Sequence, residues 1–330
     1  MTRLTAISAT LFVFVLCVES STYGQGQVLR ETFTFDGRIR SYNLYVPSNY
    51  DPANTMPLTL NFHGLTGSGD GQMAASGMNA VAEREDFLVA YPTALSGDWE
   101  QNNEDHSIAF TEALLDTIEA GFTIDTQRVY ATGFSQGAIM SYVLASAIPN
   151  RIAAIAPVSA TRTLPMEPNR VPSFLADTPE RPFPLMHIHG TNDSLAPYEG
   201  GVSAIGDRFT FDPVLTILNE WIDSNGGQSL DQVSMIPGID AADGPVSLFE
   251  CQDCGSYLTA SGDELTAEVI LLRVNGGGHS WPASDSLVAS DQIWSFFNRH
   301  QLGTAVPEPS TLLLGFLTSL GALMLRRRLR

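Results

Sequence analysis

The chain contains no lysine. All 17 of its basic residues are arginine, against 36 aspartate and glutamate residues, which gives a formal net charge of −19. Binding to nucleic acid or to an anionic membrane needs clustered positive charge, so this acidic balance argues against both partners. With 330 residues, 44% of them apolar, the chain has room for one large α/β domain or two small ones.

Cysteine is also scarce. Of the three cysteines, Cys17 lies in an apolar N-terminal run, which leaves Cys251 and Cys254 in the segment ECQDC. A zinc site needs about four ligands, and the sequence offers no second pair. In an exported chain such an isolated pair most often forms a disulfide, with free thiols or a functional pair as alternatives. The loop that it would close is short, so its entropic stabilisation would be small.

Both ends of the chain have the composition of targeting segments. Arg3 precedes the apolar run 6–18, which is shorter than the roughly 20 residues that cross a bilayer. We therefore expect a cleaved signal peptide over residues 1–24, with an uncleaved anchor as the alternative. At the other end, Pro-Glu-Pro precedes the apolar run 311–325 and four arginines. Positive charge beyond an apolar run stays on the cytoplasmic side, so physics alone indicates a weak tail anchor.

The order of these C-terminal parts closely resembles the PEP-CTERM sorting signal. The resemblance implies that residues 305–330 are a sorting tag, which a sorting protease at the membrane would remove. It also implies a protein that is secreted or displayed at the cell surface. A plain membrane anchor remains the alternative. Residues 25–304 would then form the functional domain.

Within this domain, strand-like and helix-like segments alternate. Alternating apolar and polar residues flank Asp36-Gly37, which predicts an antiparallel hairpin near the N-terminus. The alternation that follows predicts an α/β fold, with a mostly parallel central sheet and helices on both faces. The expected strands are 57–62, 87–91, 128–132, 152–158, 184–189, 246–250 and 268–274, and the expected helices are 73–85, 108–120, 138–147, 213–225 and 289–300.

Residues 159–181 interrupt this alternation with four prolines and little periodicity. The segment follows a strand, where it would lie above the sheet. It is either a lid or cleft wall or a variable surface loop.

The segment RVYATGFSQGAIMS, residues 128–141, places a Gly-x-Ser-x-Gly between a strand and a helix. This is the context of a nucleophile elbow, in which a sharp turn exposes a serine above the sheet. The glycines allow close backbone approach, and the helix N-terminus adds backbone donors beside the hydroxyl. Ser135 is therefore the candidate nucleophile.

A serine nucleophile needs a base, and the base needs an orienting acid. Asp193 and His279 follow Ser135 in the order Ser, acid, His, each on a loop expected after a strand. Asp193 could instead cap the turn that follows it, and His279 could be an ordinary loop histidine. His189 is the alternative base, but it lies within its strand, which favours a structural role.

An acyl-transfer site also needs an oxyanion hole. One backbone N–H would come from Gln136, the residue after the nucleophile. The other would come from the early strand-to-loop junction HGLTG, where Leu65 is the first choice and Thr66 the second. We expect His63 to shape this loop.

Five blocks along the chain together resemble a known family: HGLTGSG, DTQRVYATGFSQGAIMS, IAAIAPVSA, HIHGTNDSLAPYEGG and VNGGGHSWP. Their order and spacing over residues 29–302 are similar to the polyhydroxybutyrate depolymerase and feruloyl esterase group, like carbohydrate esterase family 1. The resemblance implies an α/β-hydrolase fold and a secreted serine carboxylesterase that uses no metal or cofactor. It places Ser135, Asp193 and His279 in the triad. The chain departs from the pattern at Ala138, where the group often has glycine.

The identity of the ester is less determined. Feruloyl or acetyl groups on polysaccharide and short hydroxyalkanoate esters are the candidates. Trp281 would stack on a sugar or an aromatic acyl group, with core packing as an equal alternative. Trp99 is a second cleft candidate, although a surface loop is favoured there. The rival classes are a prolyl-oligopeptidase-like peptidase, which usually carries a large extra domain, and a non-catalytic surface binding protein.

Overall fold

The computed structural model describes residues 26–99, 104–164, 178–179, 181–237, 244–284 and 287–303. The expected signal peptide and sorting tag lie outside these ranges, as does most of the proline-rich segment 159–181. Among the described residues, no helix has both the length and the apolar character needed to cross a membrane.

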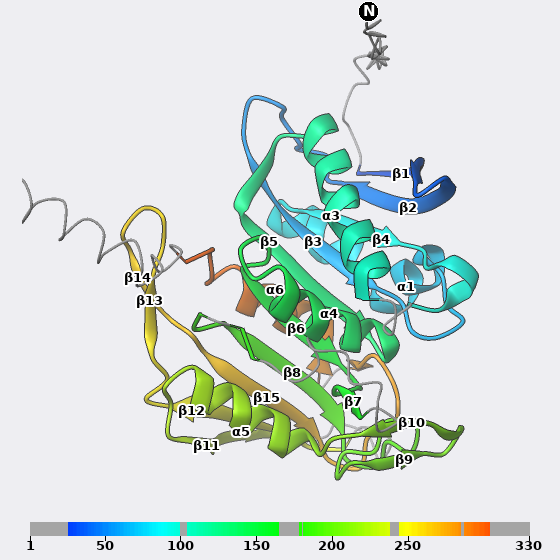
Figure 1. The fold of residues 1–330 in the computed structure, drawn as a ribbon. Coiled ribbons are helices and arrows are strands. Elements are labelled where there is room, and N and C mark those ends of the chain that lie inside the picture. The colour runs from blue at the N-terminus through cyan, green and yellow to red at the C-terminus, as the bar shows by residue number, and fades with distance from the viewer. Residues whose placement is uncertain are drawn as a thin grey trace, which may run out of the picture.

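The described part of the chain is built around a ten-stranded sheet with the order β1-β2-β4-β3-β5-β6-β8-β15-β12-β11 (Figure 1). The strands are β1 (Gln27–Phe35), β2 (Arg38–Val46), β3 (Met56–Phe62), β4 (Leu88–Pro92), β5 (Ile124–Phe134), β6 (Ala154–Val158), β8 (Leu185–Gly190), β11 (Ser229–Ile236), β12 (Val246–Gln252) and β15 (Val269–Val274). The run from β4 to β15 is parallel. This confirms the expected α/β-hydrolase architecture with its antiparallel N-terminal hairpin.

The sheet has a second antiparallel edge that the sequence did not predict. Strand β12 runs antiparallel to β15, and β11 runs antiparallel to β12. Strand β11 lies at the edge of the sheet and most of its residues are exposed, so it lacks the apolar run that marks the buried strands.

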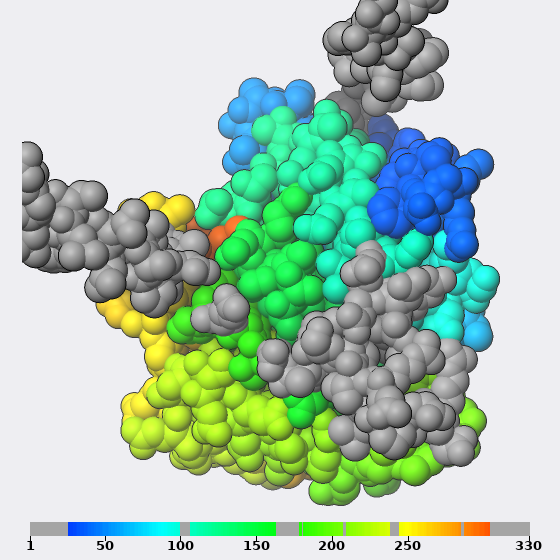
Figure 2. Space-filling view, viewed as in Figure 1, coloured from blue at the N-terminus to red at the C-terminus, as the bar shows by residue number. Residues whose placement is uncertain are grey.

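Helices cover both faces of the sheet, as expected. On one face lie α3 (Glu104–Gly121), α4 (Gln136–Ala147) and α5 (Val214–Ser224), and on the other α1 (Gly69–Ser76), α2 (Met78–Glu85) and α6 (Ala289–Phe297) (Figure 1). In the space-filling view, α3 and α4 fill the surface between the blue N-terminal hairpin and the lime-green α5 (Figure 2).

Two hydrophobic clusters match these two faces because side chains alternate along a strand. Leu58, Leu60 and Phe62 of β3 join the cluster under α3, α4 and α5. Val89 and Tyr91 of β4 join the cluster under α2 and α6. The central strands are therefore buried on both faces of the sheet.

The prediction of a single helix over residues 73–85 is wrong. The segment forms two helices, α1 and α2, that are separated by Gly77 in the left-handed conformation with φ 60°. The Gly77 N–H is donated to Met73 O and closes the first helix. A glycine adopts this conformation without steric cost, and helices commonly end in this way.

Several short strands were not predicted. Strands β7 (Thr163–Leu164), β10 (Gly206–Phe211) and β9 (Gly201–Ser203) form a small antiparallel sheet beside the main one (Figure 1). Two two-stranded ribbons pair β13 (Ser256–Leu258) with β14 (Glu264–Thr266) and β16 (Ala283–Ser284) with β17 (Leu287–Val288), and a short 3-10 turn, η1, spans Leu95–Gly97. Segments of two or three residues are too short to show a period.

Cys251 and Cys254 form a disulfide, with Sγ atoms 1.99 Å apart and Cα atoms 5.8 Å apart. The bond links the end of β12 to the turn that follows it. A Cβ atom on Gly227 would lie 2.5 Å from the sulfur of Cys251, so the disulfide is packed closely against that glycine.

We expect the disulfide to add little stability, because the loop that it closes is so short. Replacing both cysteines, C251S with C254S, should lower the free energy of unfolding by about 2 kcal/mol or less. Urea denaturation of the variant and of the oxidised parent measures this difference. A loss above about 4 kcal/mol would mean that the bond holds more than its own turn.

Candidate active site

The topology brings the three predicted triad positions to one edge of the sheet. Ser135 follows β5, Asp193 follows β8 and His279 follows β15. These strands are parallel and lie close together in the order β5-β6-β8-β15. Their carboxyl ends therefore meet at the same edge, which is where open α/β sheets bind ligands.

Ser135 occupies a sharp turn between β5 and α4, with φ 55° and ψ −117°. This conformation is rare for a residue with a side chain and is costly unless its surroundings hold it. Its N–H is donated to Val158 O at 2.9 Å, and its carbonyl accepts the N–H of Ala138 at 2.9 Å. The turn is therefore held from both sides.

The two glycines of the elbow leave no room for a side chain. A Cβ atom on Gly133 would lie 2.5 Å from the backbone of Gly137, and one on Gly137 would lie 2.1 Å from Phe62 O. Ala138, where the chain departs from its resemblance, is fully buried in a small cluster that includes Ile139. Its methyl group thus fills space that a glycine would leave empty.

Asp193 and His279 are joined directly. The Oδ2 atom of Asp193 lies 2.7 Å from Nδ1 of His279. The other oxygen, Oδ1, accepts the N–H groups of Leu195 and Ala196, both at 2.8 Å. Asp193 therefore caps its own turn and also holds the histidine, so the two roles considered from the sequence coexist.

The Asp193 side chain is completely buried. Burial by itself raises the pKa of a carboxyl group, but hydrogen bonds from His189, His279 and the Ala196 N–H outweigh it and hold the pKa of Asp193 well below its usual range. The ionised carboxylate can only accept, so Nδ1 of His279 carries a hydrogen. In the neutral ring, Nε2 is then the basic nitrogen.

A pocket of about 280 Å³ lies between the candidate nucleophile and the candidate base. Both Ser135 and His279 line it. The Leu65 and Gln136 segments form the side where an oxyanion would lie, and the rest of the wall is mainly apolar, comprising Gly64, Thr66, Phe134, Ile139, Leu195, Ile205, Phe209 and Phe211. Phe209 and Phe211 belong to strand β10 of the small β7-β10-β9 sheet, and Ile205 lies between β9 and β10.

The structure separates the two oxyanion choices in the loop after β3. The Thr66 N–H is donated to Gly97 O at 2.7 Å and is therefore engaged. Leu65 lines the pocket immediately before it. This favours Leu65 over Thr66 as the donor that accompanies Gln136.

Trp99 lies neither in the cleft nor in a surface loop, so both sequence-based expectations for it are wrong. Only 1% of it is exposed, and its indole Nε1 donates to His63 O at 2.8 Å. Its ring stands edge-on to Phe62 at 5.1 Å between centroids. The burial of Trp99 could have been predicted from its occurrence as a lone tryptophan in a polar segment, because so large an apolar side chain gains much from burial.

The side chain of Gln136 is the second functional feature that the sequence did not reveal. Its Oε1 accepts the Trp99 N–H at 3.1 Å, and its Nε2 donates to Asp98 and to Trp99 O. The residue after the nucleophile thus fastens the 97–99 segment. Since Gly97 of that segment accepts the Thr66 N–H, Gln136 indirectly holds the loop that carries Leu65.

His63 shapes its loop, as expected. Its Nε2 accepts the Ala94 N–H at 3.0 Å, so its Nδ1 carries the hydrogen and donates to Gly64 O at 2.6 Å. Burial lowers the pKa of His63, which keeps the ring neutral. Within the described ranges, no group of three or more histidine, cysteine or acidic side chains is arranged to hold a metal ion.

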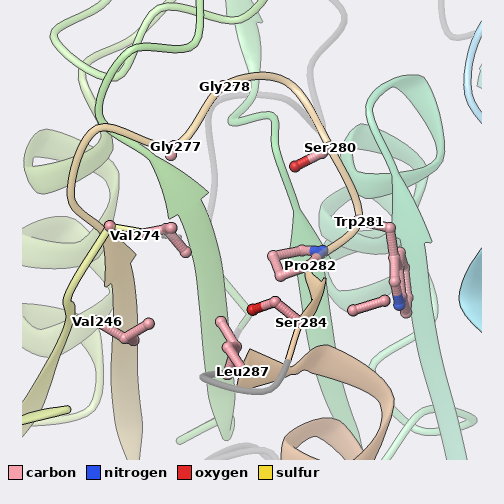
Figure 3. Close-up of a pocket in the computed structure, with 12 residues that line it drawn as sticks. Val246, Val274, Gly277, Gly278, Ser280, Trp281, Pro282, Ser284 and Leu287 are labelled. Atoms are coloured by element: carbon pink, nitrogen blue, oxygen red, sulfur yellow. The ribbon is translucent and has the colours of Figure 1, made fainter. Parts of the chain in front are cut away.

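Trp281 does not line the pocket at Ser135. It is 9% exposed, packs in the cluster under α6, and donates from Nε1 to Ser290 Oγ at 3.3 Å. Together with Val246, Val274 and the loop residues Gly277 and Gly278, it lines a different hollow of about 310 Å³. Figure 3 shows the loop through Gly277 arching over this hollow. The expected stacking role is therefore corrected to core packing.

Comparisons with known proteins identify the class of fold and enzyme. Residues 94–205 match the phospholipase/carboxylesterase family model, and residues 305–328 match the PEP-CTERM protein-sorting motif. The chain is 34% identical over 179 residues to a bifunctional acetylxylan esterase/xylanase of Neocallimastix patriciarum, a match that covers 52% of this chain and only 25% of that protein. It is 29% identical over 265 residues to feruloyl esterase C of Emericella nidulans, covering 78% of this chain and 83% of that one.

Among solved structures, the fold is similar to the feruloyl esterase module of Clostridium thermocellum complexed with sinapinate. The TM-score is 0.53 at 14% identity, over 85% of this chain and 93% of the module. These findings confirm the α/β-hydrolase fold, the PEP-CTERM tail, the resemblance to feruloyl esterases and the expected class of carboxylic ester hydrolase. The resemblance to polyhydroxybutyrate depolymerases stays a prediction.

We expect Gly137→Ala to destabilise the elbow, because its new methyl group would collide with the backbone of β3. The free energy of unfolding should fall by about 2 kcal/mol or more. The matched control is Gly121→Ala at the exposed end of α3, where a Cβ atom would meet nothing within 4 Å. That change should be neutral or stabilising by up to about 1 kcal/mol. Equal thermal midpoints for the two variants would contradict the packing described here.

A second prediction concerns the Gln136 side chain. Gln136→Leu keeps its size but removes the hydrogen bonds to residues 98 and 99, so the oxyanion loop should loosen. We expect kcat on p-nitrophenyl acetate to fall about tenfold or more, since a fully lost oxyanion donor costs roughly 10²–10³. Gln232→Leu on the exposed strand β11 is the control and should leave kcat unchanged. An unchanged kcat in Gln136→Leu would show that this clamp is dispensable.

Proposed function

We propose that this carboxylic ester hydrolase works through an acyl-enzyme formed on Ser135, with His279 as the base and Asp193 as the orienting acid. The observation that carries the proposal is the 2.7 Å contact between Asp193 Oδ2 and His279 Nδ1, made in the wall of the pocket that Ser135 also lines. This contact leaves Nε2 of His279 as the nitrogen that accepts the serine proton.

The reaction would proceed in two halves. His279 takes the proton from Ser135 as its oxygen attacks the ester carbonyl, and the N–H groups of Gln136 and Leu65 stabilise the resulting oxyanion. Collapse of this intermediate expels the alcohol, which receives the proton from His279. A water molecule then attacks the acyl-enzyme, His279 accepts its proton, and the free acid leaves as Ser135 regains a proton.

The pocket favours an acyl group that is neutral, apolar and larger than acetyl. Of the residues described by the structure that line it, His279 is the one with an ionisable side chain. Phe209 and Phe211 stand nearly parallel at 6.2 Å between ring centroids, and such rings suit an aromatic acyl group. Among feruloyl, acetyl and short hydroxyalkanoate esters, we therefore propose a feruloyl-type ester of polysaccharide as the substrate. A relative named feruloyl esterase C supports the same choice.

We propose that the protein is exported. Residues 1–24 would be removed as a signal peptide, and residues 305–330 would be processed by a sorting protease at the membrane. The match to the PEP-CTERM motif supports this route. The disulfide of Cys251 and Cys254 also supports it, because disulfides persist in oxidising compartments outside the cytosol.

The two rival functions are less well supported. A peptidase of the prolyl-oligopeptidase type has less support because the relatives reported above are named as esterases. A non-catalytic binding protein would have no need for a buried, ionised Asp193 bonded to His279.

The first prediction of this proposal is that Ser135→Ala abolishes ester hydrolysis without unfolding the protein. The rate on p-nitrophenyl acetate should fall by at least about 10³-fold, because only binding and the oxyanion donors remain. Ser146→Ala, on the helix α4 that follows Ser135, is the control and should retain activity. Near-full activity of Ser135→Ala would exclude this serine as the nucleophile.

The second prediction concerns the acyl group. The purified domain should hydrolyse methyl ferulate faster than acetylated xylan, hydroxybutyrate oligomers or peptides. Phe211→Ala should lower kcat/KM on methyl ferulate about tenfold and affect p-nitrophenyl acetate less, because it removes apolar contact with the larger acyl group. Val202→Ala, exposed on the neighbouring strand β9, is the control. Comparable slow rates on all four substrates would contradict an aromatic acyl specificity.

A further inference from the structure

A chain of buried hydrogen bonds leads from helix α4 through strand β8 to Asp193. The Tyr142 hydroxyl lies 2.9 Å from Nδ1 of His187, and Nε2 of His187 lies 2.9 Å from Nδ1 of His189. The far nitrogen of His189, Nε2, lies 2.8 Å from Ala196 O and 3.4 Å from Asp193 Oδ2. The two histidines are two residues apart on a strand, so both side chains point to the same face.

This chain is deep inside the protein. His187 is fully buried, His189 is 1% exposed and Tyr142 is 5% exposed. Burying three polar side chains is costly unless each is hydrogen-bonded, so such a network indicates a role beyond filling space. The reaction described above uses none of the three.

The acceptors next to His189 determine the direction of every hydrogen bond between Tyr142 and Asp193. Ala196 O and the Asp193 carboxylate can only accept, so Nε2 of His189 carries a hydrogen. In a neutral ring its Nδ1 then accepts from Nε2–H of His187, whose own Nδ1 accepts the Tyr142 O–H. Burial, with the neighbouring His189, holds the pKa of His187 well below its usual range, and burial raises the pKa of Tyr142. All donors therefore point toward Asp193.

The hydrogen on Nε2 of His189 is donated to Ala196 O, and the same nitrogen lies 3.4 Å from the Asp193 carboxylate. An ionised carboxylate offers about four lone-pair sites. Here Leu195 and Ala196 N–H groups fill those of Oδ1, while His279 and His189 approach Oδ2. Because Ala196 donates to Asp193 and accepts from His189, the histidine fixes both the carboxylate and its turn.

Other titratable and charged groups surround the chain from the neighbouring elements. The Tyr198 ring stands edge-on to His189 at 5.8 Å between centroids, and Arg273 of β15 is opposite His189 in the sheet register. Arg162 acts electrostatically on Tyr142, and Glu199 acts on Tyr198. Arg162 remains charged and forms ion pairs with Asp212 and Glu220.

We propose that His189, held in one tautomer by His187 and Tyr142, is a positioning residue for the hydrolytic site. It locks the Asp193 carboxylate in the orientation that keeps hydrogen on Nδ1 of His279 and leaves Nε2 facing Ser135. This inference rests on the proposed roles of Ser135, Asp193 and His279.

Two substitutions at one position separate this role from simple core packing. The amide nitrogen of His189→Gln can occupy the place of Nε2 and keep the donor, whereas the shorter side chain of His189→Asn reaches only the place of Nδ1. We expect H189N to lower kcat on p-nitrophenyl acetate about tenfold or more with KM changed less than about twofold. We expect H189Q to retain kcat within about threefold.

The pH profile gives a readout that a merely structural role would not move. Removing the N–H dipole that faces Asp193 leaves its negative charge less compensated, which favours a protonated His279. The acid limb of kcat/KM should therefore move to higher pH in H189N and stay in place in H189Q. Tyr142→Phe removes only the first donor and should shift kcat and the acid limb in the same direction, but less.

Measurements on these variants either support or overturn the positioning role of His189. A wild-type-like kcat and acid limb in H189N would overturn the inference, as would equal losses of activity and of thermal midpoint in H189N and H189Q. If H189N does not fold, Tyr142→Phe decides, and unchanged kcat and acid limb in that variant overturn the proposal. A wild-type protein that hydrolyses no ester would instead overturn the proposed function, and the inference with it.

Discussion

The hydrogen bond between Asp193 and His279 is the interaction on which the rest of the site depends. It joins two loops from different strands, and it works only because β8 and β15 are parallel neighbours that end at the same edge of the sheet. Asp193 and His279 follow the carboxyl ends of these two strands, which places both side chains at that edge. Ser135 reaches the same edge from β5 through a strained turn. The arrangement of the three proposed catalytic residues is thus a consequence of strand order.

Supports on two sides turn this arrangement into a rigid site. On the acid side, His189 and the amides of the 195–196 turn surround the Asp193 carboxylate. On the oxyanion side, Trp99 and Gln136 fasten the loop that follows β3. In both places a buried side chain is hydrogen-bonded to a backbone segment beside a proposed catalytic group. Catalysis by preformed donors and oriented bases requires such fixed surroundings, because no energy is then spent on reorganising them during the reaction.

The placement of Ser135, Asp193 and His279 at one edge of the sheet could be predicted from the sequence, because the signals for it are local. A strand, a glycine turn and a helix identify Ser135, and loops directly after strands identify Asp193 and His279. The break at Gly77 was missed, because the residues on both sides of it form helices. The roles of Trp99 and the Gln136 side chain could not be predicted, since they depend on contacts between segments more than 30 residues apart. The exposed edge strand β11 and the short strands of the small sheet carry too little periodicity to identify.

The most direct test of this account is labelling with a fluorophosphonate, which reacts covalently only with an activated serine. After exposure of the wild-type protein, peptide mass spectrometry should find the adduct on Ser135. The His279→Ala variant should label far more slowly under the same conditions, because the serine has lost its base. An adduct on another serine, no adduct at all, or labelling of Ser135 that is unaffected by the loss of His279 would contradict the triad.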